Sequence, residues 1–129
     1  DNLSDAVIVG AGGLGKAFLG YEGFKSNGLN IVAAFDVDLR IVGEEIAGKK
    51  VYPMDKFSDF VQHKKINIGI ITVPKAAAQE TLDTMVRAGI KAVWNFAPAP
   101  LRVPKGIILK NEDLSASLAL LAGELSKGR

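Results

Sequence analysis

The sequence predicts an α/β fold, a doubly wound parallel sheet with helices on both faces. Two observations predict it. Short apolar runs bounded by glycine, proline and polar residues alternate with segments of helical periodicity along the 129 residues. The hydrophobic fraction is 48% with only 7% aromatics, which favours a core of Ala, Val, Ile and Leu between helices and a buried sheet. At this length we expect one domain.

The individual elements follow from the spacing of apolar residues. Strands are expected at residues 6–9, 31–35, 68–73, 92–96 and 107–109, with a brief extended piece at 51–52. Helices are expected at residues 13–21, 55–64 and 76–88, with a short helix near 40–46. Gly89 follows the third of these as a stop signal. A last helix is expected from Asp113, a good N-cap, to about Leu125.

The composition excludes several classes of function. There is no cysteine, so disulfides, thiolate nucleophiles and cysteine-ligated metals are excluded. No apolar run approaches the ~20 residues of a membrane span, and no targeting segment opens the chain, so we expect a cytoplasmic protein without a membrane partner. The 16 basic and 14 acidic residues are scattered. They supply neither a basic face for nucleic acid nor a cluster suggestive of a metal site.

A glycine-rich motif directly follows the first expected strand and opens the first expected helix. Its residues are Gly10, Ala11, Gly12, Gly13, Leu14 and Gly15, which fit G-x-G-x-x-G. In this context the motif indicates a Rossmann-type dinucleotide-binding domain. Gly10 would permit the tight turn, Gly12 would let the backbone approach a diphosphate, and Gly15 would let helix and strand pack closely. The alternative is a strand–helix turn without a ligand.

Asp36 is the second expected anchor for a dinucleotide. It lies 21 residues after Gly15, at the end of the second expected strand. A carboxylate there can accept both hydroxyls of the adenosine ribose and would repel a 2′-phosphate. This chemistry favours NAD(H), that is NADH or NAD+, as the ligand. The alternative is an Asp that caps a turn, a role for which we favour Asp38.

Two further strand ends are candidates for the nicotinamide half of the site. Ligands of doubly wound sheets bind outside the carboxyl ends of the strands. Val73 and Pro74 follow the third strand, and Asn95, Phe96 and Ala97 close the next one. We expect these five residues to contact the cofactor. Alternatively, the prolines at these ends simply terminate strands.

No residue of the chain is expected to be catalytic. The only histidine, His63, stands in the polar stretch Gln62-His63-Lys64-Lys65 and is expected to be a solvated surface residue. Trp94 is expected in the core. An NAD-dependent dehydrogenase would also need a substrate domain and an acid/base group near the substrate.

Several segments together resemble the redox-sensing transcriptional repressor family Rex over nearly the whole chain. They are residues 10–15, 33–38, 70–74 with 78–79, 88–91, 95–98, 103–104 and 111–114. The resemblance implies a homodimer that binds operator DNA through an N-terminal winged helix and releases it when NADH binds. It further implies that Tyr21 lies near the nicotinamide, that Asp113 engages it from the partner subunit, and that the last helix is exchanged across the dimer.

The resemblance also sets the expected domain organisation. Residues 1–112 would form the dinucleotide-binding core, and residues 113–129 a C-terminal dimerisation helix of the same domain. The winged-helix half is absent from this chain, which starts at Asp1 and is expected to be cut from a longer protein at a domain boundary.

Alternatives remain open for both the last helix and the function. The stripe of Leu114, Leu118, Leu121 and Leu125, widened by Leu120, would otherwise pack on the helix's own sheet. The domain would otherwise be the cofactor half of an NAD-dependent dehydrogenase or a coenzyme-A-binding domain. The fold alone does not separate these functions.

Overall fold

The computed structural model of the chain describes residues 3–112 and 114–127, and within these it leaves out the side chains of residues 114–119. Asp113 lies outside the described residues. The strands are β1 (Ser4–Val9), β2 (Leu29–Asp36), β3 (Glu45–Ile46), β4 (Lys49–Pro53), β5 (Ile68–Ile71), β6 (Ala92–Asn95) and β7 (Ile108–Asn111). They form one sheet in the order β3-β4-β2-β1-β5-β6-β7.

The predicted parallel sheet is confirmed for the described chain. Every strand pair is parallel except β3 with β4. The central strand β1 pairs with β2 on one side and β5 on the other, so that Val9 stands in register with both Phe35 and Ile71. The carboxyl ends of these three strands therefore meet at one edge of the sheet. From β1 the order of strands runs through β2 in one direction and through β5 in the other, so the winding of the chain reverses here.

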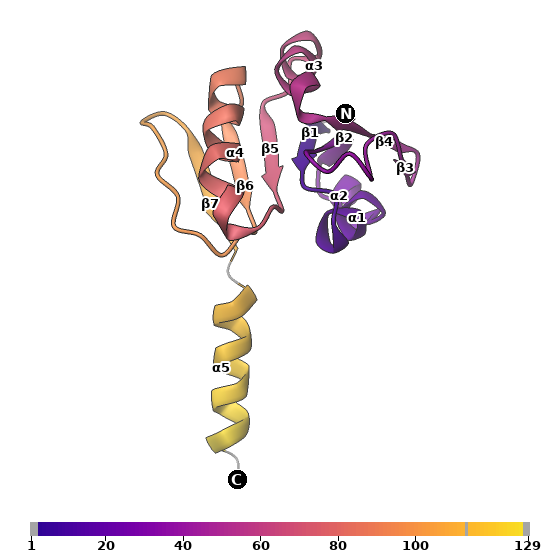
Figure 1. The fold of residues 1–129 in the computed structure, drawn as a ribbon. Coiled ribbons are helices and arrows are strands. Elements are labelled where there is room, and N and C mark those ends of the chain that lie inside the picture. Colours follow the sequence, from indigo (N-terminus) through magenta and orange to yellow (C-terminus); the bar gives the residue numbers. More distant parts are fainter. Residues whose placement is uncertain (1–2, 113, 128–129) are drawn as a thin grey trace.

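Helices cover both faces of the sheet, as the sequence predicts (Figure 1). The helical elements are α1 (Gly13–Leu19), α2 (Gly23–Ser26), the short 3₁₀ helix η1 (Met54–Lys56), α3 (Phe57–Lys64), α4 (Lys75–Ala88) and α5 (Leu114–Lys127). Side chains of α3 and α4 pack on one face of the sheet, and those of α1 and α2 pack on the other.

The alternation of side chains along β1 explains why both faces are apolar. Val7 and Val9 point into the core under α3 and α4, whereas Ile8 points into the core under α1 and α2. All three are at most 2% exposed. Burial on both faces is the usual situation of a central parallel strand, and it accounts for the unbroken apolar run in the sequence.

The prediction of a short helix near residues 40–46 is wrong. Residues 39–43 form turns, and a β3–β4 hairpin follows. Gly43 has a φ of 93°, which is incompatible with a right-handed helix, and the hairpin turn places Ala47 and Gly48 at φ values of 52° and 80°. Two consecutive positive φ angles are the requirement of a type I′ turn, the turn that matches the twist of a hairpin.

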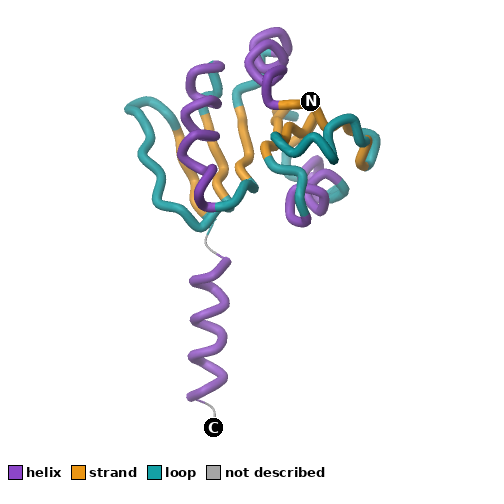
Figure 2. Tube along the Cα trace, viewed as in Figure 1, coloured by secondary structure: helices purple, strands orange, loops and turns teal. Residues whose placement is uncertain are grey.

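Helix α5 stands clear of the sheet (Figures 1 and 2). Leu120, Leu121 and Leu125 are 73%, 68% and 66% exposed. Within one chain these three side chains therefore do not pack on the sheet. Among the described residues, no helix combines the length and apolar character that crossing a membrane requires.

The turn between β1 and α1 is built on a close approach that only glycine permits. Gly10 has a φ of 105°. A Cβ placed on Gly15 would collide with the Gly10 carbonyl oxygen. Gly15 thus lets the first turn of α1 lie directly against the end of β1, as expected from the sequence.

Gly15→Ala should therefore destabilise the domain, whereas Gly13→Ala should not. A Cβ at Gly13 has no heavy atom within 4 Å. We expect Gly15→Ala to lower the free energy of unfolding by about 1–3 kcal/mol, the usual cost of overpacking. Gly13→Ala should stay within about 0.5 kcal/mol of wild type or be slightly stabilising. Urea denaturation of the three proteins measures this, and equal stabilities would contradict the close approach.

Candidate functional site

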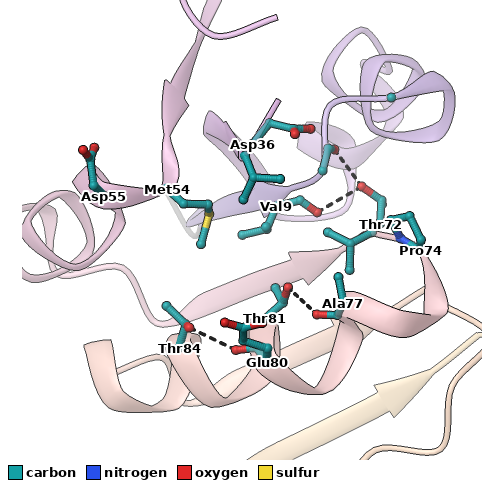
Figure 3. Close-up of a pocket in the computed structure, with 14 residues that line it drawn as sticks. Val9, Asp36, Met54, Asp55, Thr72, Pro74, Ala77, Glu80, Thr81 and Thr84 are labelled. Atoms are coloured by element: carbon teal, nitrogen blue, oxygen red, sulfur yellow. Dashed lines mark hydrogen bonds between the residues drawn. The ribbon is translucent and has the colours of Figure 1, made fainter. Parts of the chain in front are cut away.

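A cavity of about 770 Å³ opens at the carboxyl ends of β1, β2 and β5 (Figure 3). Its size is typical of small-molecule sites. The strand ends contribute Val9, Gly10, Gly12, Asp36, Val37, Thr72, Val73 and Pro74, η1 contributes Met54 and Asp55, and α4 contributes Ala77, Glu80, Thr81 and Thr84. The cavity thus lies where the winding of the sheet reverses, the place where open α/β sheets bind ligands.

The Asp36 carboxylate joins the end of β2 to the glycine turn. Its Oδ2 accepts a hydrogen bond from the Ala11 N–H at 2.7 Å, and its Oδ1 accepts one from the Asp38 N–H at 2.8 Å. A carboxylate has about four acceptor positions, so one lone pair on each oxygen remains for a ligand. Asp36 is therefore both oriented by the backbone and able to receive two further hydroxyl groups.

Thr72, which follows β5 on the other side of β1, also bonds to the glycine turn. Its Oγ1 lies 2.7 Å from the Gly10 carbonyl oxygen and 3.2 Å from that of Val9. The Val9 carbonyl already accepts the Thr72 N–H at 3.0 Å. The Thr72 hydroxyl therefore donates its proton to the Gly10 carbonyl oxygen, which makes the shorter of the two contacts.

The charged side chains that line the cavity are all acidic. They are Asp36, Asp55 and Glu80, and none of the lining residues, all within the described chain, is Lys or Arg. Arg40 is close to Asp36 in the sequence, but its Nε and Nη2 donate to the two carboxylate oxygens of Asp38 at 3.0 and 2.9 Å. This bidentate pair holds the pKa of Asp38 below its ordinary value. The site therefore favours a ligand without an additional phosphate at this end.

Helix α4 presents one polar face to the cavity. Ala77, Glu80, Thr81 and Thr84 recur at the spacing of one helix face. The Thr81 and Thr84 hydroxyls donate to the carbonyls of Ala77 and Glu80 at 2.8 and 3.0 Å (Figure 3). Sequence reasoning missed this face, because helical spacing groups these residues but packing decides which face of the helix meets the cavity.

The structure brings five of the residues expected in the site together. Gly10, Gly12, Asp36, Val73 and Pro74 all line the cavity. A Cβ on Gly12 would meet nothing within 4 Å, so the backbone there is open to a bound group.

The other four residues of the glycine motif lie beside the cavity rather than in its lining. Ala11 is fully buried and contributes its N–H to Asp36. Gly13, Leu14 and Gly15 form the first turn of α1.

The last residue of β6, Asn95, and the two residues after it are not among those that line the cavity. Asn95 is fully buried, and its Nδ2 donates to the carbonyl of Ala97 and to Asn111 Oδ1, while its Oδ1 accepts the Ala97 N–H. Ala97 is buried as well, and the Phe96 ring packs 4.8 Å from Phe18 on the face of α1 and α2. The Asn95 amide is therefore used to shape its own turn.

Tyr21 also lies apart from the cavity. Its side chain is 57% exposed, and its ring stands edge-on to Phe24 at 4.9 Å. Phe24 in turn contacts Trp94, which is half-buried rather than fully in the core and whose buried Nε1 has no hydrogen-bond partner. Tyr21 thus belongs to an exposed aromatic cluster. Its expected partner, Asp113, is outside the described residues.

Neither a metal centre nor a histidine occupies the cavity of the described chain. No group of three or more His, Asp or Glu within residues 3–112 and 114–127 is arranged to hold a metal ion. His63 lies exposed in the last turn of α3, as predicted, and is not among the lining residues.

Comparison with known proteins gives a consistent result. Residues 1–99 match the family model described as CoA binding domain. The redox-sensing transcriptional repressor Rex of Clostridioides difficile (strain 630) is 43% identical over 129 residues, which is all of this chain and 61% of that protein. The Rex repressor of Syntrophomonas wolfei is 45% identical over 122 residues, 95% of this chain and 58% of that protein.

Solved structures agree with the sequence relatives. The crystal structure of RSP, a Rex-family repressor, superposes with a TM-score of 0.92 at 41% identity and covers 99% of this chain and 61% of that one. Structures of RSP with β-NADH, and with β-NAD+ and operator DNA, both give a TM-score of 0.91. The chain spans about three-fifths of the length of these proteins. It belongs to the CoA-binding domain family, and over the part that they share it is similar to Rex repressors.

Proposed function

We propose that this chain is the NAD(H)-binding, redox-sensing domain of a Rex-type repressor, and that NADH binding releases the complete dimer from operator DNA. The observation that carries the proposal is the Asp36 carboxylate, held against the glycine turn with one lone pair on each oxygen free. The relatives named as redox-sensing repressors, and the RSP structures with β-NADH and β-NAD+, support the same ligand.

The charge of the cavity favours NAD(H) over the other adenosine cofactors. NADP(H) carries a phosphate on the 2′ oxygen of this ribose, and coenzyme A carries one on the 3′ oxygen. Either phosphate would lie close to Asp36 in a cavity that also contains Asp55 and Glu80. Unpaired like charges at short range are unfavourable. The family description names CoA, but these carboxylates favour a ribose with both hydroxyls free.

Asp36→Ala should weaken NADH binding strongly and narrow the preference for NADH over NADPH. The variant loses two charge-assisted hydrogen bonds to ribose, each worth roughly 1.5–3 kcal/mol. It also loses the repulsion of a 2′-phosphate. Calorimetric titration with NADH, NADPH and coenzyme A measures both effects, with Asp59→Ala as a control because Asp59 is exposed on α3, outside the cavity. A wild-type chain that binds NADPH or coenzyme A as tightly as NADH would contradict the assignment.

The distinction between NADH and NAD+ must come from the nicotinamide ring. The two forms share adenosine and diphosphate, but the ring is neutral when reduced and cationic when oxidised. Val73 and Pro74 give the cavity an apolar wall toward the end of β5, and burying an unpaired cation against such a wall is costly. The reduced form should therefore favour a closed dimer. A ligand shifts such an equilibrium only by its differential affinity for the two states.

In the closed dimer, we propose that the exposed Tyr21 meets Asp113 of the partner subunit. An unpaired carboxylate near the ring would attract NAD+, so the tyrosine hydroxyl must hold it by a hydrogen bond. A 100-fold preference for NADH corresponds to about 2.7 kcal/mol, which is sufficient for a useful switch.

Tyr21→Phe should lower the ratio of NADH to NAD+ affinity without abolishing the binding of either form. The change removes only the hydroxyl group that holds the carboxylate. Tyr52→Phe is the matched control, because Tyr52 is half-buried against Phe35 and does not line the cavity. Parallel titrations with both cofactors measure the ratio. Equal affinities of the wild-type dimer, or steady hydride transfer to a simple carbonyl compound, would count against a sensor and favour the dehydrogenase alternative.

Helix α5 supports a homodimer as the functional form. An isolated helix of 14 residues is marginal in water, and this one exposes Leu120, Leu121 and Leu125. We propose that a second copy of the chain covers these side chains through exchange of the helices. Contact with operator DNA is then made by the part of the relatives' length that this chain does not span, because its own basic residues are scattered.

Deletion of residues 113–129 should convert the dimer into a monomer and weaken NADH binding, since it removes both the apolar helix and Asp113. Deletion of residues 126–129 alone is the control, because it leaves the leucine stripe intact. Analytical ultracentrifugation with NADH titration measures the outcome. A wild-type chain that sediments as a monomer at high concentration would remove the dimer proposal.

A further inference from the structure

One peptide group of the glycine turn is held from both of its sides. The carbonyl of the Gly10–Ala11 peptide accepts the Thr72 hydroxyl at 2.7 Å, and its N–H donates to Asp36 Oδ2 at 2.7 Å. Asp36 ends β2 and Thr72 follows β5, so the two strands that flank β1 each contribute one side chain. Figure 3 shows the dashed bonds from Thr72 to Val9 and to the turn that follows it.

The backbone alone fixes the path of the turn but not the orientation of this peptide. The Gly10 N–H donates to the Phe35 carbonyl and the Thr72 N–H donates to that of Val9. Neither bond involves the Gly10–Ala11 peptide plane. Rotation of that plane changes ψ of Gly10 and φ of Ala11, and Gly10 has no Cβ to restrict its ψ, so the resistance at Gly10 itself is small. A rotated plane would turn the carbonyl oxygen toward the Asp36 carboxylate and would remove the N–H that orients it.

We infer that Thr72 is a positioning residue for the adenine dinucleotide, acting through the Gly10 carbonyl on the turn and on the Asp36 carboxylate. The inference rests on the proposed function. Asp36 can receive two ribose hydroxyls only while the Ala11 N–H holds it, and the Thr72 hydroxyl keeps that N–H directed at Asp36. Thr72 acts on the part of the ligand that NADH and NAD+ share, so it does not contribute to the distinction between them.

Thr72→Val should lower the affinities for ADP-ribose, NADH and NAD+ by a common factor of about 3–10, the usual effect of losing one hydrogen bond. The variant keeps the side-chain shape and loses the hydroxyl group. Thr72→Ser restores the hydroxyl and should bind within about twofold of wild type. Ser58→Ala is the control, because it removes a hydroxyl from the exposed surface of α3, outside the cavity. Calorimetry on the full chain gives the affinities.

Coupling to Asp36 separates positioning from a general loss of structure. In an Asp36→Asn background the carboxylate that the Thr72 hydroxyl positions is absent. Thr72→Val should therefore lower the affinity for ADP-ribose by less than about a further twofold. Amide hydrogen exchange should show faster exchange of the Ala11 N–H in Thr72→Val and not in Thr72→Ser. If Thr72→Val fails to fold, Thr72→Cys, a much weaker donor, takes its place with the same expectations.

Three results would overturn the inference. They are an unchanged ADP-ribose affinity in Thr72→Val, a serine variant as weak as the valine variant, and equal losses in the wild-type and Asp36→Asn backgrounds. Failure of the wild-type chain to bind NADH, NAD+ and ADP-ribose would instead refute the proposed function, and the positioning role with it. The two failures are therefore distinguishable in one set of titrations.

Discussion

The contact between Gly15 and the Gly10 carbonyl is the constraint on which the functional end of the molecule depends. Because no side chain separates them, α1 begins directly against the end of β1. The turn between the two elements is thereby pressed between β2 and β5, within reach of Asp36 and Thr72. Had the helix started one side chain further away, the turn would lack the bonds from both neighbouring strands.

Much of the fold followed from local patterns because those patterns reflect burial. The run of residues 6–9 has no polar member, and a strand with both faces covered needs none. Gly89, which was predicted to stop this helix, ends α4 in the left-handed conformation. The helix predicted near residues 40–46 was wrong because its pattern does not reflect burial in a helix. The apolar spacing of these residues suits a helix, but the positive φ angles at Gly43, Ala47 and Gly48 belong to turns that no periodicity reveals.

The site was predictable at the strand ends and less so elsewhere. Asp36 and the glycine motif are defined by distance along the chain, which is visible in a sequence. Phe96 and Ala97 were grouped with Val73 and Pro74 because both pairs follow a strand. The structure separates them: Val73 and Pro74 line the cavity, whereas Phe96 packs against Phe18 and Ala97 is bonded to the buried Asn95 amide. The face of α4 depends on the rotation of a helix about its axis, which only packing sets.

The aromatic cluster beside Tyr21 has a practical consequence. Trp94 is the one tryptophan of the chain, and its ring lies between Phe24 and Phe96 on the face of the sheet opposite the cavity. Its indole nitrogen is shielded from water. Trp94 is therefore a single intrinsic fluorophore within the aromatic cluster that contains Tyr21. When a nucleotide that does not absorb tryptophan emission is added, a change in that emission reports a rearrangement that reaches this aromatic cluster.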